Sequence, residues 1–304
     1  MTAAARRAHE LTSFACDQAG LVSRAQLHAA GVDADYVRNQ IRAGRWQAWG
    51  RRVIAVTTGP LSADQVAWLA VLDGGPDCVI AGLSALERYG LSGFTLDRVH
   101  TAVPKNGRPG RHDLFVRREC RRLDAAAVHP AKRPSTMRIE LAVVDALQHM
   151  TSRLRGCALL AALVQQRLVR PDLLRGLLTG ATTLRNRKLY LSVAGDIEGG
   201  AHSLTEVDFT RLAREARIRP PVLQSVREDG DGRRRYVDAD FDGFLVEVDG
   251  AMHLRPLAWW DDMFRQNQLV IAHKPVLRFP SVGIYLSRDK VIAQLKAAAA
   301  RWPS

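Results

Sequence analysis

Four residues that can bind a metal ion or transfer a proton lie close together near the C-terminal end of the sequence: Asp238, Glu247, Asp249 and His253. Residues two apart on a strand share a face, so Glu247 and Asp249 are expected to point the same way. Carboxylates gathered at the end of a buried strand repel one another unless a cation compensates. Oxygen ligands suit Mg²⁺ or Mn²⁺, which polarises a phosphodiester and activates water. The pattern predicts a metal-dependent phosphodiesterase.

Three of these residues, and Glu206 earlier in the sequence, also have a structural explanation. Asp249 can simply end a strand in a turn, and Glu247 can pair with an arginine. His253 is either structural or a general acid or base, since imidazole titrates near neutral pH. Glu206 follows Ser203 by three residues, the spacing of a capping box, so it is either part of a helix cap or an acid that projects towards the metal.

One further helix is expected to serve the same site. Residues 257–272 show a helical pattern in which Arg265 is placed to contact the scissile phosphate or to order the carboxylates. Trp259 and Trp260 begin this helix, and either stack on bases or pack in the core.

The elements that must position these residues follow from apolar patterning. Strands are expected at 236–240, 244–248 and 275–279, with a turn at Asp242-Gly243 between the first two. The middle strand is mostly apolar and is expected to be buried on both faces. Helices are expected at 203–220 and 288–301.

Residues 203–297 resemble the domain of unknown function that is grouped with very-short-patch-repair endonucleases. The resemblance rests on Tyr-Val-Asp238, Val-Glu247-Val-Asp249-Gly-x-x-His253, Trp-Trp-x-Asp262-Met-x-Arg265-Gln-Asn and Val-Leu-Arg278-Phe-Pro. Those endonucleases belong to the restriction-endonuclease-like superfamily, whose pattern is an Asp followed by Glu-x-Lys. The resemblance implies that Asp238 and Glu247 are metal ligands. Asp249 stands where the lysine is usual, and His253 is the candidate to replace it.

A second set of polar residues lies near the other end of the sequence. Ser23 and Asp33 are predicted to cap helices at 24–30 and 34–43, and an aromatic, basic stretch at 46–56 suits a two-stranded wing. Short helices joined by a tight turn are typical of helix-turn-helix units. The candidate DNA contacts are Tyr36, Arg38, Asn39, Arg42, Arg45, Arg51 and Arg52. The alternative is a solvated basic face.

Residues 18–130 are similar to the N-terminal region of proteins related to the AbiEi family, antitoxins of a bacterial abortive-infection system. The similarity is carried by Gly20-Leu-Val-Ser-Arg-Ala-Gln-Leu, Gly31-Val, Ile41-Arg-Ala-Gly-Arg-Trp46, Val53-Ile-Ala-Val, Ala81-Gly-Leu-Ser-Ala-Leu and Gly90-Leu. It implies a DNA-binding winged helix, with a cognate toxin or a second copy of the chain as possible partners.

Composition agrees with a nucleic-acid partner. The 304 residues carry a formal net charge of +13, with 44 Lys and Arg against 31 Asp and Glu, and such a surplus favours a polyanion. The four cysteines are scattered, which argues against a thiolate zinc site. Without a signal-like N-terminus or a long apolar run, a cytoplasmic protein that does not enter a membrane is expected.

Together these patterns predict an α+β multidomain protein. Residues 1–58 are expected to form a winged helix-turn-helix, 59–134 a mixed α/β region and 135–200 a helical connector that ends in a linker at Gly195–Gly200. Residues 201–304 are expected to form a restriction-endonuclease-like domain with a central mixed sheet. The function expected is a DNA-binding, Mg²⁺-dependent endonuclease, and the alternative is an antitoxin-type regulator with a silent nuclease-like domain.

Overall fold

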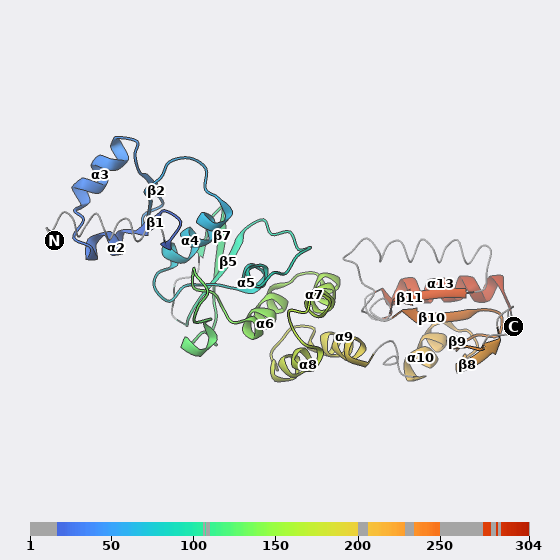
Figure 1. The fold of residues 1–304 in the computed structure, drawn as a ribbon. Coiled ribbons are helices and arrows are strands. Elements are labelled where there is room, and N and C mark those ends of the chain that lie inside the picture. Colours follow the sequence, from blue (N-terminus) through green and yellow to red (C-terminus); the bar gives the residue numbers. More distant parts are fainter. Residues whose placement is uncertain are drawn as a thin grey trace. The chain divides into compact units, whose positions relative to one another are not determined.

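The computed structural model describes residues 17–105, 107, 110–199, 206–228, 234–249, 276–280, 284 and 287–303. They belong to two compact units, Met1–Ala146 and Leu147–Ser304 (Figure 1). The fold is α+β, with three small antiparallel or mixed sheets among these residues. No helix in the described part is both long and apolar enough to cross a membrane.

The first unit begins with two short helices and a three-stranded antiparallel sheet. The elements are β1 (Leu21–Ser23), α2 (Arg24–Ala29), α3 (Ala34–Arg42), β2 (Gln47–Trp49) and β3 (Val53–Ala55), with the strand order β1-β3-β2. Ser23 caps α2 in a capping box with Gln26, and Asp33 caps α3, as predicted. The sequence also predicts a helix at residues 9–19, of which only residues 17–19 are described.

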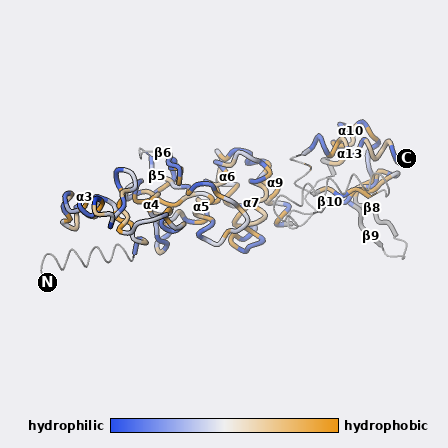
Figure 2. The backbone as a smooth tube through the Cα atoms, turned by 90° about the horizontal axis from the view of Figure 1, so that it is seen from above, coloured by the Kyte–Doolittle hydropathy of each residue, from blue (hydrophilic) through white to orange (hydrophobic). Residues whose placement is uncertain are grey.

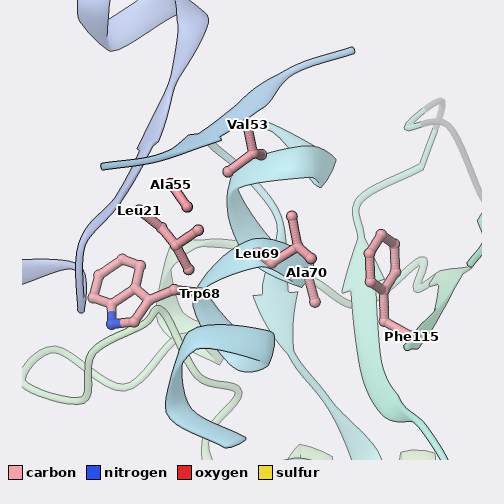
Figure 3. Close-up of a cluster of buried hydrophobic side chains, with 7 residues drawn as sticks. All are labelled: Leu21, Val53, Ala55, Trp68, Leu69, Ala70 and Phe115. Carbon is pink, nitrogen blue, oxygen red and sulfur yellow. The ribbon is translucent and has the colours of Figure 1, made fainter. Parts of the chain in front are cut away.

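Alternation along β1 and β3 buries both faces of this sheet. On one face, Val22 and Ile54 pack with Leu27 of α2 and Val37 of α3. On the other face the cluster consists of Leu21, Val53, Ala55, Trp68, Leu69, Ala70 and Phe115, drawn in Figure 3. The sheet is therefore held between α2–α3 on one side and the following helix on the other.

The second sheet of this unit is mixed. Its elements are β4 (Val79–Ile80), β5 (Val99–Val103), β6 (Gly110–Arg111) and β7 (Phe115–Glu119), in the order β4-β5-β7-β6, with β5 and β7 parallel. Helices α4 (Ala63–Gly74) and α5 (Gly82–Arg88) contact it, and a 3-10 turn covers Ala125–Ala127. The largely buried ion pair Arg117–Asp73, with 2.6 Å between Nη2 and Oδ2, ties β7 to α4.

Helices dominate the next stretch of the chain. They are α6 (Ile139–His149), in which the boundary between the units falls, α7 (Arg153–Gln165), α8 (Pro171–Gly180) and α9 (Arg187–Gly199). The prediction of a linker at Gly195–Gly200 is wrong as far as Gly199, because α9 continues through it. Tyr190, Val193 and Ala194, with Ile197, recur at helical spacing and are buried, which outweighs the glycine.

The third sheet contains β8 (Val222–Glu228), β9 (Arg234–Asp240), β10 (Leu245–Asp249) and β11 (Val276–Pro280), in the order β11-β10-β9-β8. The first three strands along the chain are antiparallel, and β11 runs parallel to β10. The central mixed sheet expected here is thus present. Strand β8 was not predicted.

Two helices accompany this sheet, α10 (Glu206–Ala216) and α13 (Arg288–Arg301). They contact each other and lie together on one side of the strands in Figure 2, where the tube alternates between hydrophobic and hydrophilic colours along them. The guanidinium of Arg288 donates from Nε and Nη2 to the two carboxylate oxygens of Glu215, at 2.7 and 3.0 Å. This fork, which lowers the pKa of Glu215, links the start of α13 to the end of α10.

Candidate metal centre and nucleic-acid interface

Strand β10 lies between β9 and β11. At this strand one face of the sheet is buried and the opposite face carries polar side chains. Val246 is fully buried, as is Leu277, its partner on β11, and Ala239, its partner on β9. The intervening residues Glu247 and Arg278 point to the opposite face. The expectation that β10 is buried on both faces is therefore wrong, because the carboxylate-bearing face is open enough to leave Glu247 about a third exposed (30%).

The register between β9 and β10 brings two predicted ligands together. The antiparallel ladder pairs Leu245 with Asp240 and Val246 with Ala239. Continued by one residue, the same alignment sets Asp238 opposite Glu247. Residues directly opposite in an antiparallel pair share a face, so both carboxylates belong to the polar face of the sheet.

An arginine stands on the other side of Glu247. The parallel ladder pairs Glu247 with Arg278 of β11. Arg278 donates from Nε to Oε2 of Glu247 at 2.9 Å, and its Nη2 lies 2.8 Å from the same oxygen in an ion pair. Neither contact uses Oε1 of Glu247. The side chain of Arg278 is half exposed (53%), so it is not held in place by burial.

The carboxylates provide part of a metal site. In the described region no group of three or more His, Cys, Asp and Glu side chains is arranged to hold a metal. Asp238 and Glu247 supply two hard oxygen donors, which fits Mg²⁺ or Mn²⁺, with Arg278 as a competing cation. The backbone of Asp249 ends β10 and that of Glu206 begins α10, but their side chains lie outside the description.

His253 and Arg265 also lie outside the described residues, so their predicted roles stay predictions. A further carboxylate, Asp240, has a structural role instead. It is buried, and its Oδ1 accepts a hydrogen bond from the backbone N–H of Asp242 at 2.9 Å, at the turn between β9 and β10. Asp242 adopts a positive φ of 70°, the left-handed conformation that short polar side chains tolerate.

The polar face of α3 is the second candidate site. Val37 and Ile41 pack into the core of the unit, which turns Arg38, Asn39 and Arg42 outward. All three are exposed. Arg38 forms an ion pair with Asp35 on the same helix, and both side chains are about two-thirds exposed, so this contact holds Arg38 only weakly.

The hairpin of β2 and β3 continues this exposed basic surface. The ring of Tyr36 meets that of Trp46 edge to face at 5.7 Å, so α3 is braced against the start of the hairpin. Arg45 is exposed and donates from Nε to Oε1 of Gln40 at 2.6 Å. Arg51 and Arg52 occupy the turn between the strands, and both are exposed.

Comparison with known proteins assigns no function, so a functional proposal has to rest on these two candidate sites. No protein-family model matches the chain, and no curated protein shows significant sequence similarity to it.

Sequence reasoning missed one participant in the polar face. The sequence assigns Arg278 only to a strand and to a motif of the resemblance, although an arginine between apolar neighbours in Val-Leu-Arg278-Phe is itself a signal. Because its apolar neighbours on the strand point into the core, the side chain of Arg278 has to lie on the opposite face. The parallel pairing with β10, which puts it beside Glu247, cannot be read from the sequence.

Proposed function

We propose that this protein binds duplex DNA through α3 and the β2–β3 hairpin, in the manner of a winged helix. The observation that supports this most directly is the outward face of α3, whose arginines and asparagine project from a helix anchored by two apolar residues. Residues 17–58 contain six arginines and three aspartates, so this segment carries a net charge of +3 (6 − 3). A helix of this kind fits the major groove, and basic side chains on the wing reach backbone phosphates.

The DNA-binding proposal is tested by gel shift with a duplex in the presence of EDTA. We expect binding that is independent of divalent ions and weakens steeply with salt. The variant Arg42→Ala is expected to bind less tightly and to show a shallower salt dependence by about one phosphate contact. The exposed Arg121, outside this surface, provides the control Arg121→Ala. Equal losses in both variants would assign the effect to overall charge.

We further propose that the polar face of the C-terminal sheet is a divalent-metal nuclease centre of the restriction-endonuclease-like kind. Asp238 and Glu247 are the ligands, and the alignment of the two on adjacent strands supports their acting together. A bound Mg²⁺ would polarise the scissile phosphodiester and help to form the attacking hydroxide. Arg278 lies on the same face and would contact a phosphate oxygen there, a task suited to guanidinium.

Metal binding has its own test, separate from cleavage. Titration of Mn²⁺ followed by electron paramagnetic resonance is expected to show a bound ion in the native protein and weaker binding in Asp238→Asn. The exposed turn residue Asp242 offers the control Asp242→Asn, which removes a carboxylate from the same hairpin without touching the proposed ligands. Binding that survives in Asp238→Asn would place the ion elsewhere.

A second function is favoured by one specific contact. A hydrogen bond and an ion-pair contact from Arg278 neutralise Oε2 of Glu247 without any metal. This supports the alternative of a DNA-binding regulator of the antitoxin kind, in which the nuclease-like sheet serves assembly or a partner such as a toxin. That alternative predicts tight duplex binding and no cleavage with any divalent ion.

A further inference from the structure

A cavity of about 570 Å³ opens at the base of the β2–β3 hairpin. It lies within the first unit, between the start of α2, the hairpin turn and the end of α4. Its lining includes three arginines, Arg24, Arg51 and Arg52. The volume falls in the range typical of sites for small organic ligands.

The charged side chains among the described residues that line this cavity are all positive. None of the described residues that line it is acidic. Among the residues that the structure describes, neither Arg24 nor Arg51 has a carboxylate partner, and Arg52 donates from Nη1 only to the backbone carbonyl of Asp73, at 3.0 Å. The backbone N–H of Arg24 donates to the carbonyl of Arg52 at 2.7 Å, which keeps the two arginine-bearing segments adjacent. Positive charge gathered in a partly enclosed space favours an anion.

The remaining wall is apolar. Trp68, Val71 and Leu72 of α4 line it together with Pro76. Trp68 also belongs to the buried cluster of Figure 3, so this wall is part of a packed core and keeps its shape. A ligand for this cavity therefore needs an apolar body as well as a negative group.

We propose that this cavity binds a small organic anion, an aromatic or aliphatic carboxylate or sulfonate, whose charged group meets the arginines and whose apolar part rests against α4. The site is independent of the nuclease proposal. It adjoins the DNA-binding proposal only through Arg51 and Arg52, which belong to both surfaces.

The probe for the test is 8-anilinonaphthalene-1-sulfonate, whose fluorescence rises in apolar surroundings, titrated into the full chain without DNA. We expect one saturable site per chain. Arg24→Ala removes a cation from the lining, and Ala25→Glu places an acid at an exposed position of the cavity rim. Each is expected to weaken binding about tenfold, as for the loss of a charge-assisted contact.

The matched control is Ala29→Glu, the same substitution at another exposed position of the short helix α2 and outside the lining. It is expected to leave the affinity for the probe unchanged, and circular dichroism establishes that each variant is folded. Identical titrations in all four proteins overturn the proposal. Displacement of the probe by duplex DNA, with Arg24→Ala losing affinity for the duplex equally, also overturns it, because the cavity would then be part of the DNA surface. If duplex binding alone fails, the proposed DNA-binding function is contradicted, while the probe result still supports the anion site.

Discussion

At the scale of single residues, the contact between Glu247 and Arg278 separates the two proposed functions. Arg278 contacts one carboxylate oxygen of Glu247. It is either a permanent partner of that carboxylate or a cation that a metal ion displaces. Because the two side chains are 30% and 53% exposed, their attraction is largely screened and is worth about 1 kcal/mol or less. Such a weak contact can be exchanged for a divalent ion.

Replacing Arg278 tests this exchange. We predict that Arg278→Met tightens Mn²⁺ binding severalfold, because the competing guanidinium is gone, while the free energy of unfolding changes by about 1 kcal/mol or less. Electron paramagnetic resonance and urea unfolding measure the two quantities. The variant Arg301→Met, at an exposed position near the end of α13, is the control. An unchanged or weaker affinity for Mn²⁺ in Arg278→Met would mean that Arg278 does not compete with a metal.

Cys157 carries a prediction about pH. Burial raises the pKa of this thiol from its ordinary value of 9.0 to about 12. The unfolded chain therefore loses the proton at lower pH than the folded one, so the stabilisation is complete below pH 9.0 and is lost as the pH rises towards 12. Between about pH 8 and about pH 10.5, we expect native stability to fall by about 2 kcal/mol more than that of Cys157→Ala. If urea unfolding shows the same loss of stability with pH in the native protein and in Cys157→Ala, the prediction is contradicted.

At the scale of elements, α7 and α9 meet at a glycine. A Cβ at Gly156 of α7 would lie 2.8 Å from the ring carbons of Tyr190 on α9, closer than packed atoms approach. By contrast, Gly176 of α8 has nothing within 4 Å of the same added atom. One helical glycine is thus required by packing and the other is not.

These two glycines make a matched pair. Gly156→Ala is expected to lower the free energy of unfolding by about 1–3 kcal/mol through overpacking. Gly176→Ala is expected to raise it by about 0.5–1 kcal/mol, because alanine is the better helix former. Thermal or urea unfolding measures the sign of the change in the free energy of unfolding for each variant. Stabilisation by Gly156→Ala would show that α7 and α9 are not in the close contact described.

Elements that depend on local signals could be predicted from the sequence, and those that depend on distant partners could not. Ser23, Asp33 and Ser62 mark the starts of α2, α3 and α4 because each caps its own helix. Strand β8 mixes three apolar residues with polar and charged ones, and among the described strands it is an edge strand paired with β9, so its sequence carries little strand signal. The α9 prediction failed because glycine was weighed above the apolar spacing around it.

The same distinction applies to the candidate site. Glu247 and Asp238 could be placed on neighbouring strands because a recognisable turn at Asp242-Gly243 joins those strands. Arg278 could not be placed beside them, since β11 follows β10 only after residues 250–275 and its parallel register is a property of the folded sheet. The exposed face of α3 was predictable because helical spacing alone separates Val37 and Ile41 from the arginines.

At the scale of the whole molecule, the proposed function combines a basic surface in one unit with a carboxylate-bearing sheet in the other. The net charge of +13 favours retention on a polyanion, and a metal centre on the same chain would act on the strand that is bound. The regulator alternative uses the same first surface and leaves the second without chemistry. Cleavage therefore decides between them.

The most direct measurement is conversion of supercoiled plasmid to nicked or linear DNA by the purified full chain with Mg²⁺ or Mn²⁺. We predict cleavage by the native protein, its abolition by EDTA, and a loss of at least about a hundredfold in both Asp238→Asn and Glu247→Gln, while all three proteins retain duplex binding. Duplex binding without cleavage under any divalent ion, or cleavage that persists in both variants, would contradict the account.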